Sequence, residues 1–152
     1  MRYQLQRTQQ LSADLDTVWN FFSSPFNLSR ITPKEMNFVV LNDIKEGSIF
    51  EGMLIDYKVS PLLGIPMKWT TLITQVQEKI SFTDFQQSGP YKLWNHFHEF
   101  IPNEKGVLIK DTVDYELPLG FLGDMMHTWM VNRKLNHIFN YRQQVLEKLF
   151  NS

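Results

Sequence analysis

The sequence predicts an α+β fold in which a curved antiparallel sheet carries a long C-terminal helix across its concave face. Two observations indicate this fold. After residue 36, about six segments with alternating side chains follow one another, and short turn signals separate them, as in an antiparallel sheet. The only long run with helical spacing, residues 119–150, comes after all of these segments.

The first part of the chain predicts one strand and two short helices. Residues 3–9 alternate and predict the strand. Ser12 stands where a helix N-cap is expected. Apolar residues then recur with helical spacing at Leu15, Val18, Trp19 and Phe22. Residues 27–32 predict a further turn or two before Pro33 stops the helix.

The remaining strands are predicted over residues 38–41, 49–59, 68–76, 80–86, 91–101 and 107–117. In the final helix, one stripe consists of Val131, Leu135, Ile138, Val145, Leu146 and Leu149. Met125, Met126 and Trp129 project away from that stripe. We therefore expect these three residues to cover something else, which is a pocket wall, an interface or a loop.

Composition limits the classes of function. The 152 residues suffice for one core, so we expect residues 1–152 to form a single domain. The net charge of −1 gives no basic footprint for nucleic acid, and the lack of cysteine excludes disulfides and a cysteine nucleophile. No signal peptide or transmembrane segment is evident, so a cytoplasmic protein is expected. Aromatic residues, at 14%, indicate either an aromatic-lined cavity or a phenylalanine-rich core.

The last two predicted strands bring an ionisable pair onto the inward face. A four-residue loop over residues 102–105 pairs Ile101 with Gly106 and sets His96 opposite Asp111. This pairing leaves three interpretations open. Asp111 satisfies a buried His96, or the histidines orient an apolar ligand, or His96 or His98 is a general acid or base tuned by the carboxylate. No metal is expected, because the spacing supplies no evident third ligand.

Several motifs resemble a known family. Residues 82–86 (FTDFQ), Gly89-Pro90 and residues 94–100 (WNHFHEF) resemble a stretch of bacterial SRPBCC proteins. These proteins belong to the START-like, helix-grip superfamily of polyketide cyclases and lipid-binding START domains. Residues 18–22, 27–33, 111–118 and 139–142 match further, so the resemblance covers nearly the whole chain in order. It implies an antiparallel sheet of six to seven strands around the last helix, with an internal cavity.

The resemblance implies that the chain binds an apolar or aromatic small molecule, such as a lipid or a polyketide-like compound, without a cofactor. We expect a cavity of about 300 Å³ or more between the sheet and the C-terminal helix. Its expected contacts are Trp69, Trp94, His96, His98, Asp111, Met126 and Trp129.

Two alternative functions remain open. One is a cyclase or dehydratase that uses His96 as acid or base with Asp111. The other is a non-catalytic module whose group of Met125, Met126 and Trp129 docks a partner or a membrane. A homodimer is a further option for that group.

Overall fold

The structure, a computed structural model, describes residues 1–44, 47–61 and 64–152. Within these residues seven strands form one antiparallel sheet in the spatial order β1-β7-β6-β5-β4-β3-β2. The strands are β1 (Arg2–Leu11), β2 (Val39–Val40), β3 (Leu54–Val59), β4 (Met67–Gln77), β5 (Ser81–Ser88), β6 (Leu93–Asn103) and β7 (Gly106–Glu116). The predicted helix-grip fold is confirmed.

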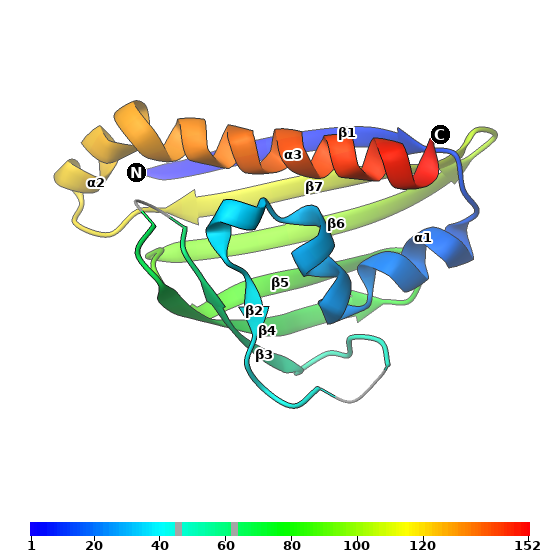
Figure 1. Cartoon of the computed structure of the whole chain (residues 1–152), viewed down its shortest axis with the longest axis horizontal. Helices are drawn as coiled ribbons and strands as arrows, with labels where there is room; N and C mark the ends of the chain where they lie inside the picture. The colour runs from blue at the N-terminus through cyan, green and yellow to red at the C-terminus, as the bar shows by residue number, and fades with distance from the viewer. Residues whose placement is uncertain (45–46, 62–63) are drawn as a thin grey trace.

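The helical elements follow β1 and β7 in the chain. After β1 come α1 (Leu15–Phe22) and two 3-10 helices, η1 (Pro25–Ile31) and η2 (Lys34–Met36). After β7 come α2 (Phe121–Met126), a π-helical turn η3 (His127–Val131) and α3 (Asn132–Phe150). Figure 1 shows α3 lying lengthwise over β1 and β7, with η1 and α1 on the same face of the sheet. Of the helices in the described residues, none is long and apolar enough to cross a membrane.

The core lies between this face of the sheet and the helices. Along β7 the buried side chains alternate with half-buried ones, as a strand with one face on a core requires. Val107, Ile109 and Val113 supply apolar area from that strand. From α3, Leu135 and Leu146 are at most 3% exposed. The final helix therefore closes the concave side of the sheet.

Two local predictions in the first half of the chain were wrong. The N-cap of α1 is Asp14 rather than Ser12, because the Thr17 N–H donates to Asp14 Oδ1 at 2.7 Å. The predicted strand over residues 49–59 begins only at Leu54. Gly52 has a φ of +92°, which belongs to a turn rather than a strand.

The predicted register of the last hairpin was wrong by two residues. Asn103 rather than Ile101 pairs with Gly106, so the turn contains two residues instead of four. The Lys105 N–H donates to Asn103 Oδ1 at 3.0 Å, which stabilises the tighter turn. A shift of two keeps every side chain on its predicted face. Asp111 now lies opposite His98, and His96 lies opposite Val113.

The π-helical turn interrupts the C-terminal helix that was predicted as one continuous run. The turn at His127–Val131 holds an extra residue, so the helix N-terminal to it is rotated relative to α3. The apolar side chains of that first part face solvent rather than the core. The most exposed are Leu119, Phe121, Leu122 and Trp129, between 59% and 78%.

Gly106 offers a test of the observed hairpin. A Cβ at this position would collide with the carbonyl oxygen of Leu11 on β1, and the φ of +131° disfavours any side chain. We expect Gly106→Ala to lower the free energy of unfolding by about 2 kcal/mol, measured by urea denaturation. Gly47→Ala is the matched control, because Gly47 has a similar φ of +149° but open space around it. Equal losses in the two variants would contradict the close approach of β1 to the hairpin.

Candidate ligand cavity and its buried charge cluster

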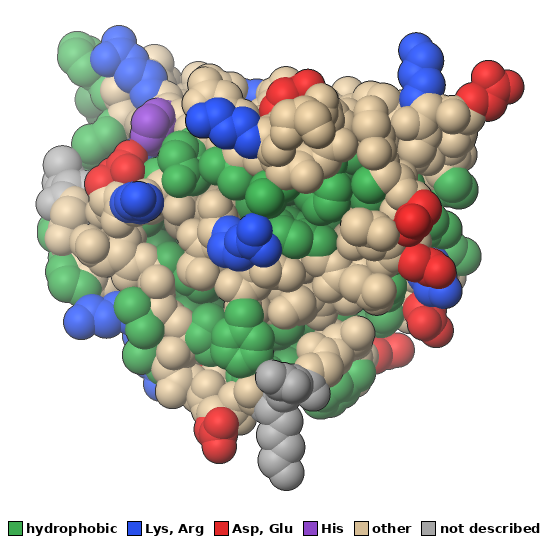
Figure 2. All heavy atoms as spheres, turned by 45° about the vertical axis from the view of Figure 1, so that its right-hand side comes forward, with side chains coloured by type: hydrophobic (Ala, Val, Ile, Leu, Met, Phe, Trp, Pro, Cys, Tyr) green, Lys and Arg blue, Asp and Glu red, His purple; other side chains and the backbone are tan. Residues whose placement is uncertain are grey.

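A cavity of about 180 Å³ lies between the concave face of the sheet and the helices η1 and α3. Most of its wall is apolar, including Phe22, Leu28, Ile31, Ile55, Ile73, Leu135, Ile138 and Phe139. Hydrophobic side chains also gather across the middle of the molecular face in Figure 2. The cavity is smaller than the 300 Å³ expected from the sequence, so it suits a smaller molecule than a typical drug-sized ligand.

Aromatic side chains form one end of this cavity. Trp69 from β4 and Trp94 from β6 meet edge to face, with ring centroids 5.4 Å apart. Tyr57 from β3 stacks on Trp69 at 5.9 Å. Trp69 is 6% exposed, yet its indole Nε1 has no hydrogen-bond partner among the described residues. Because an indole N–H is only a donor, this atom is available to an acceptor inside the cavity.

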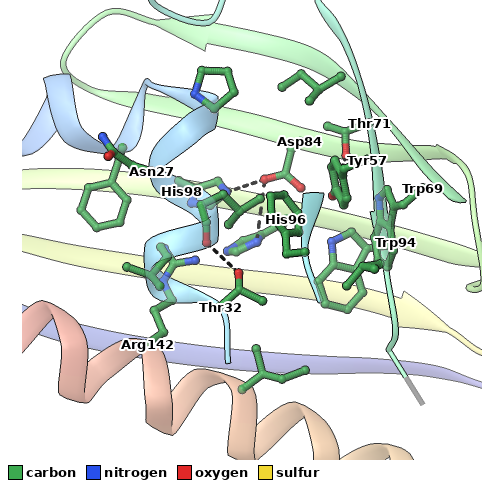
Figure 3. Close-up of a pocket in the computed structure, with 18 of the residues that line it drawn as sticks. Asn27, Thr32, Tyr57, Trp69, Thr71, Asp84, Trp94, His96, His98 and Arg142 are labelled. Atoms are coloured by element: carbon green, nitrogen blue, oxygen red, sulfur yellow. Dashed lines mark hydrogen bonds and ion pairs between the residues drawn. The ribbon is translucent and has the colours of Figure 1, made fainter. Parts of the chain in front are cut away.

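A cluster of five ionisable side chains lies beside this aromatic end, and Figure 3 labels its members Asp84, His96, His98 and Arg142. It consists of Asp84 on β5, His96 and His98 on β6, Asp111 on β7 and Arg142 on α3. These strands are neighbours in the sheet, and the side chains occupy inward-facing positions. All the members line the cavity except Asp111, which lies behind the histidines.

Each carboxylate contacts both imidazoles. His98 Nε2 lies 2.6 Å from Asp84 Oδ2, and His96 Nε2 lies 2.8 Å from Asp111 Oδ1. His98 Nδ1 is 3.2 Å from Asp111 Oδ1, but its geometry is not that of a hydrogen bond, so the contact is electrostatic. The imidazole rings stack with centroids 3.7 Å apart. Arg142 Nη2 donates to Asp111 Oδ1 at 3.2 Å.

The members of the cluster shift one another's pKa values. Burial alone would raise the pKa of Asp111, but the Arg142 guanidinium and the hydrogen bond from His96 outweigh burial and hold that pKa well below its ordinary value. Burial would also lower the pKa of His98, yet the two adjacent carboxylates raise it. Burial and the charge on His98 lower the pKa of His96. These shifts favour ionised carboxylates beside Arg142 and make His98 more basic than His96.

The structure places some predicted site residues on the cavity and others elsewhere. Trp69, Trp94, His96 and His98 line it, whereas Asp111 reaches it only through the histidines. Met126 borders a second hollow of about 130 Å³ beside Leu117 and Val131. Trp129 and Met125 are 78% and 47% exposed and lie outside both walls. Both side chains project away from the buried stripe that contains Val131 and Leu135, so they face solvent.

Sequence reasoning did not identify Asp84 as a member of the site. Its signal was a charged residue between Phe82 and Gln86 on the buried face of a predicted strand. Gln86 has a structural explanation, because its amide bonds both backbone groups of Tyr91 at 2.7 and 3.0 Å and fixes the turn at Gly89 and Pro90. Asp84 does not fix a turn in this way, because it bonds to the His98 ring at 2.6 Å. With His96 and His98 it provides three donor atoms within 4.8 Å of one another.

Comparison with known proteins supports the fold. No family model and no curated protein matches the sequence. Among solved structures, the major latex-like protein 151 of Panax ginseng is 16% identical, with a TM-score of 0.70 over 99% of this chain and 98% of its own. A START superfamily protein from Mycobacterium smegmatis is 17% identical, with a TM-score of 0.69 over 96% and 98%. A protein from Thermus thermophilus is 15% identical, with a TM-score of 0.69 over 97% and 95%.

Removal of the Asp111 charge tests the electrostatic balance. Asp111→Asn leaves Arg142 and His98 in the core without their shared counter-charge. We expect a loss of about 3–5 kcal/mol in the free energy of unfolding, measured in urea. Asp114→Asn is the control on the same strand, because Asp114 lies on the opposite face and should cost less than about 1 kcal/mol. Similar losses in the two variants would show that the buried cluster is not a major source of stability.

Proposed function

Because this chain has the START-like helix-grip fold, we propose that it binds a small apolar or aromatic molecule in the cavity between the sheet and α3. Proteins of this superfamily bind hydrophobic ligands. The observation that carries the proposal is an apolar cavity whose wall holds buried hydrogen-bonding atoms that have no partner in residues 1–44, 47–61 and 64–152. Protein interiors normally fill such space and satisfy such atoms, so their combination here supports a ligand site.

The volume of the cavity indicates the size of the ligand. An apolar cavity of about 150 Å³ is large enough for one benzene ring. At about 180 Å³, the present cavity suits a molecule with one or two rings better than a sterol or a long-chain lipid. The edge-to-face and stacked aromatic side chains at its end favour a flat, aromatic ligand.

The unpartnered atoms indicate the polarity of the ligand. The Trp69 indole N–H and the Arg142 Nε–H are buried donors that have no acceptor in the part of the chain that the structure describes. Both residues line the cavity. A hydroxyl or carbonyl oxygen on the ligand would supply an acceptor, which removes the cost of a buried unsatisfied donor. We therefore specify an aromatic ligand that carries at least one oxygen.

The alternatives from the sequence have less support. A cyclase or dehydratase using His96 and Asp111 needs both side chains at the cavity, and only His96 lines it. A docking surface made of Met125, Met126 and Trp129 is exposed, but nothing in the structure identifies its partner. A cytoplasmic location, a single domain over residues 1–152 and a homodimer stay predictions.

The binding proposal is tested with 2-naphthol, a two-ring phenol, by calorimetry and by ¹H–¹⁵N NMR of the tryptophan indoles. We expect one molecule per chain and a shift of the Trp69 indole signal, assigned with Trp69→Phe. Trp129 is the internal control, because its exposed indole lies away from the cavity and should not shift. A shift of Trp129 in place of Trp69, or no binding, would contradict the proposal.

A cavity-filling variant gives the matching mutational test. Ile55 is 7% exposed and lines the cavity, whereas its neighbour Leu54 points outward and is 47% exposed. We expect Ile55→Phe to weaken 2-naphthol binding by about tenfold or more, because the added ring occupies ligand space. Leu54→Phe should bind as the unchanged protein does. Equal affinities for the two variants would place the ligand elsewhere.

A further inference from the structure

We propose that Asp84, His96 and His98 form a binding site for a divalent transition-metal ion on the cavity wall. Their donor atoms lie within 4.8 Å of one another on the neighbouring strands β5 and β6. Two imidazoles and one carboxylate form a common protein donor set for Zn²⁺ and non-haem Fe²⁺. This inference does not depend on the proposed organic ligand.

The orientation of His96 supports this site. Its Nε2 carries the hydrogen that is donated to the Asp111 carboxylate at 2.8 Å, so its Nδ1 carries a lone pair. Nδ1 faces Asp84 Oδ2 at 3.8 Å and makes no hydrogen bond within the described residues. Asp84 Oδ2 accepts the hydrogen of His98 Nε2 at 2.6 Å, but no donor among the described residues lies between it and the lone pair of His96 Nδ1. A metal ion would bond to both.

Asp111 has the position of a supporting group behind the metal ligands. Histidines that bind a metal usually donate their other ring N–H to a carboxylate, which fixes the ring. Asp111 Oδ1 accepts such a bond from His96 Nε2 at 2.8 Å, whereas its contact with His98 Nδ1 at 3.2 Å is electrostatic and has no hydrogen-bond geometry. Arg142 in turn fixes Asp111 at 3.2 Å. Figure 3 shows Asp84, His96 and His98 directed toward one another.

Metal binding requires a rotation of at least one imidazole and a small shift of Asp84, because the stacked rings of His96 and His98 lie only 24° from parallel and an ion must lie near the plane of each ring. The 2.6 Å between His98 Nε2 and Asp84 Oδ2 is a hydrogen-bond distance, whereas donor atoms bonded to one Zn²⁺ at about 2.1 Å lie about 3–3.5 Å apart. The ion would replace the proton in that bond and displace the carboxylate by less than about 1 Å. Asp84 can make this movement, because its side chain is the most exposed of the ligands, at 20%, against 7% and 8% for the histidines.

The open positions of such an ion would face the cavity, since all three ligand residues line it. A catalytic type of metal site keeps a position for water or substrate, in contrast to a closed structural site. The ion would therefore bind an oxygen of a molecule in the cavity. This places the metal beside the proposed ligand rather than in a separate part of the fold.

The test uses metal alone. Chelator-treated protein is titrated with Zn²⁺ by calorimetry and with Co²⁺ by visible absorption. We expect one ion per chain and a loss of affinity of more than about tenfold in Asp84→Asn, since even changes to groups behind the ligands cost that much. His137→Gln is the control, because His137 forms an exposed pair with Glu35 at 2.7 Å. Its affinity should not change.

A measurement on the unchanged protein covers the case in which Asp84→Asn fails to fold. Zn²⁺ should shift the ¹⁵N signals of His96 Nδ1 and His98 Nε2 and leave those of His127 and His137 in place. Absence of one-to-one binding, full affinity in Asp84→Asn, or shifts at His127 or His137 instead would overturn the proposal. Binding of 2-naphthol to the metal-free protein is measured separately, so the failure of either proposal can be recognised without the other.

Discussion

The carboxylate of Asp111 joins three elements that surround the cavity. From β7 it accepts a hydrogen bond from His96 on β6 and another from Arg142 on α3. A buried carboxylate without such partners would cost several kcal/mol, so the sequence that places Asp111 inside also needs the guanidinium of the last helix. Helix α3 is thereby held at a defined position along the sheet. The cavity lies between the sheet and α3, which the hydrogen bond between Asp111 and Arg142 connects.

Apolar periodicity made most of the fold predictable. Strands such as 107–117 and the stripe on the last helix were evident, because one buried face imposes period two or 3.6 on the chain. Pairings between distant segments were less predictable. The partner of β1 is β7, and no local pattern in residues 3–9 indicates that choice. The hairpin register depended on a turn whose length the sequence did not determine.

The candidate site was predictable in part. His96 and Asp111 do meet, although they are not opposite each other, because their side chains reach diagonally across the strands. Asp84 was overlooked since its strand joins the cluster only through the sheet order β5-β6-β7. Trp129 was wrongly assigned to the cavity, although its position opposite the buried stripe of the helix agrees with the 78% exposure of its side chain. The periodicity of a segment indicates which of its side chains are buried, whereas the membership of a site also depends on which segments lie next to one another in the fold.

The pairing of β1 with β7 also determines when the fold can be completed during synthesis. Arg2 and Glu116 are 114 positions apart, so the first strand must wait for most of the chain before it finds its partner. Contacts this distant in sequence make folding slow and leave an unpaired strand exposed. Arg142 is synthesised later still, after both carboxylates and both histidines. A ribosome-bound chain that stops before residue 142 therefore lacks the Arg142 guanidinium that bonds to Asp111. Burial of the Asp111 carboxylate in the core has to wait for that partner.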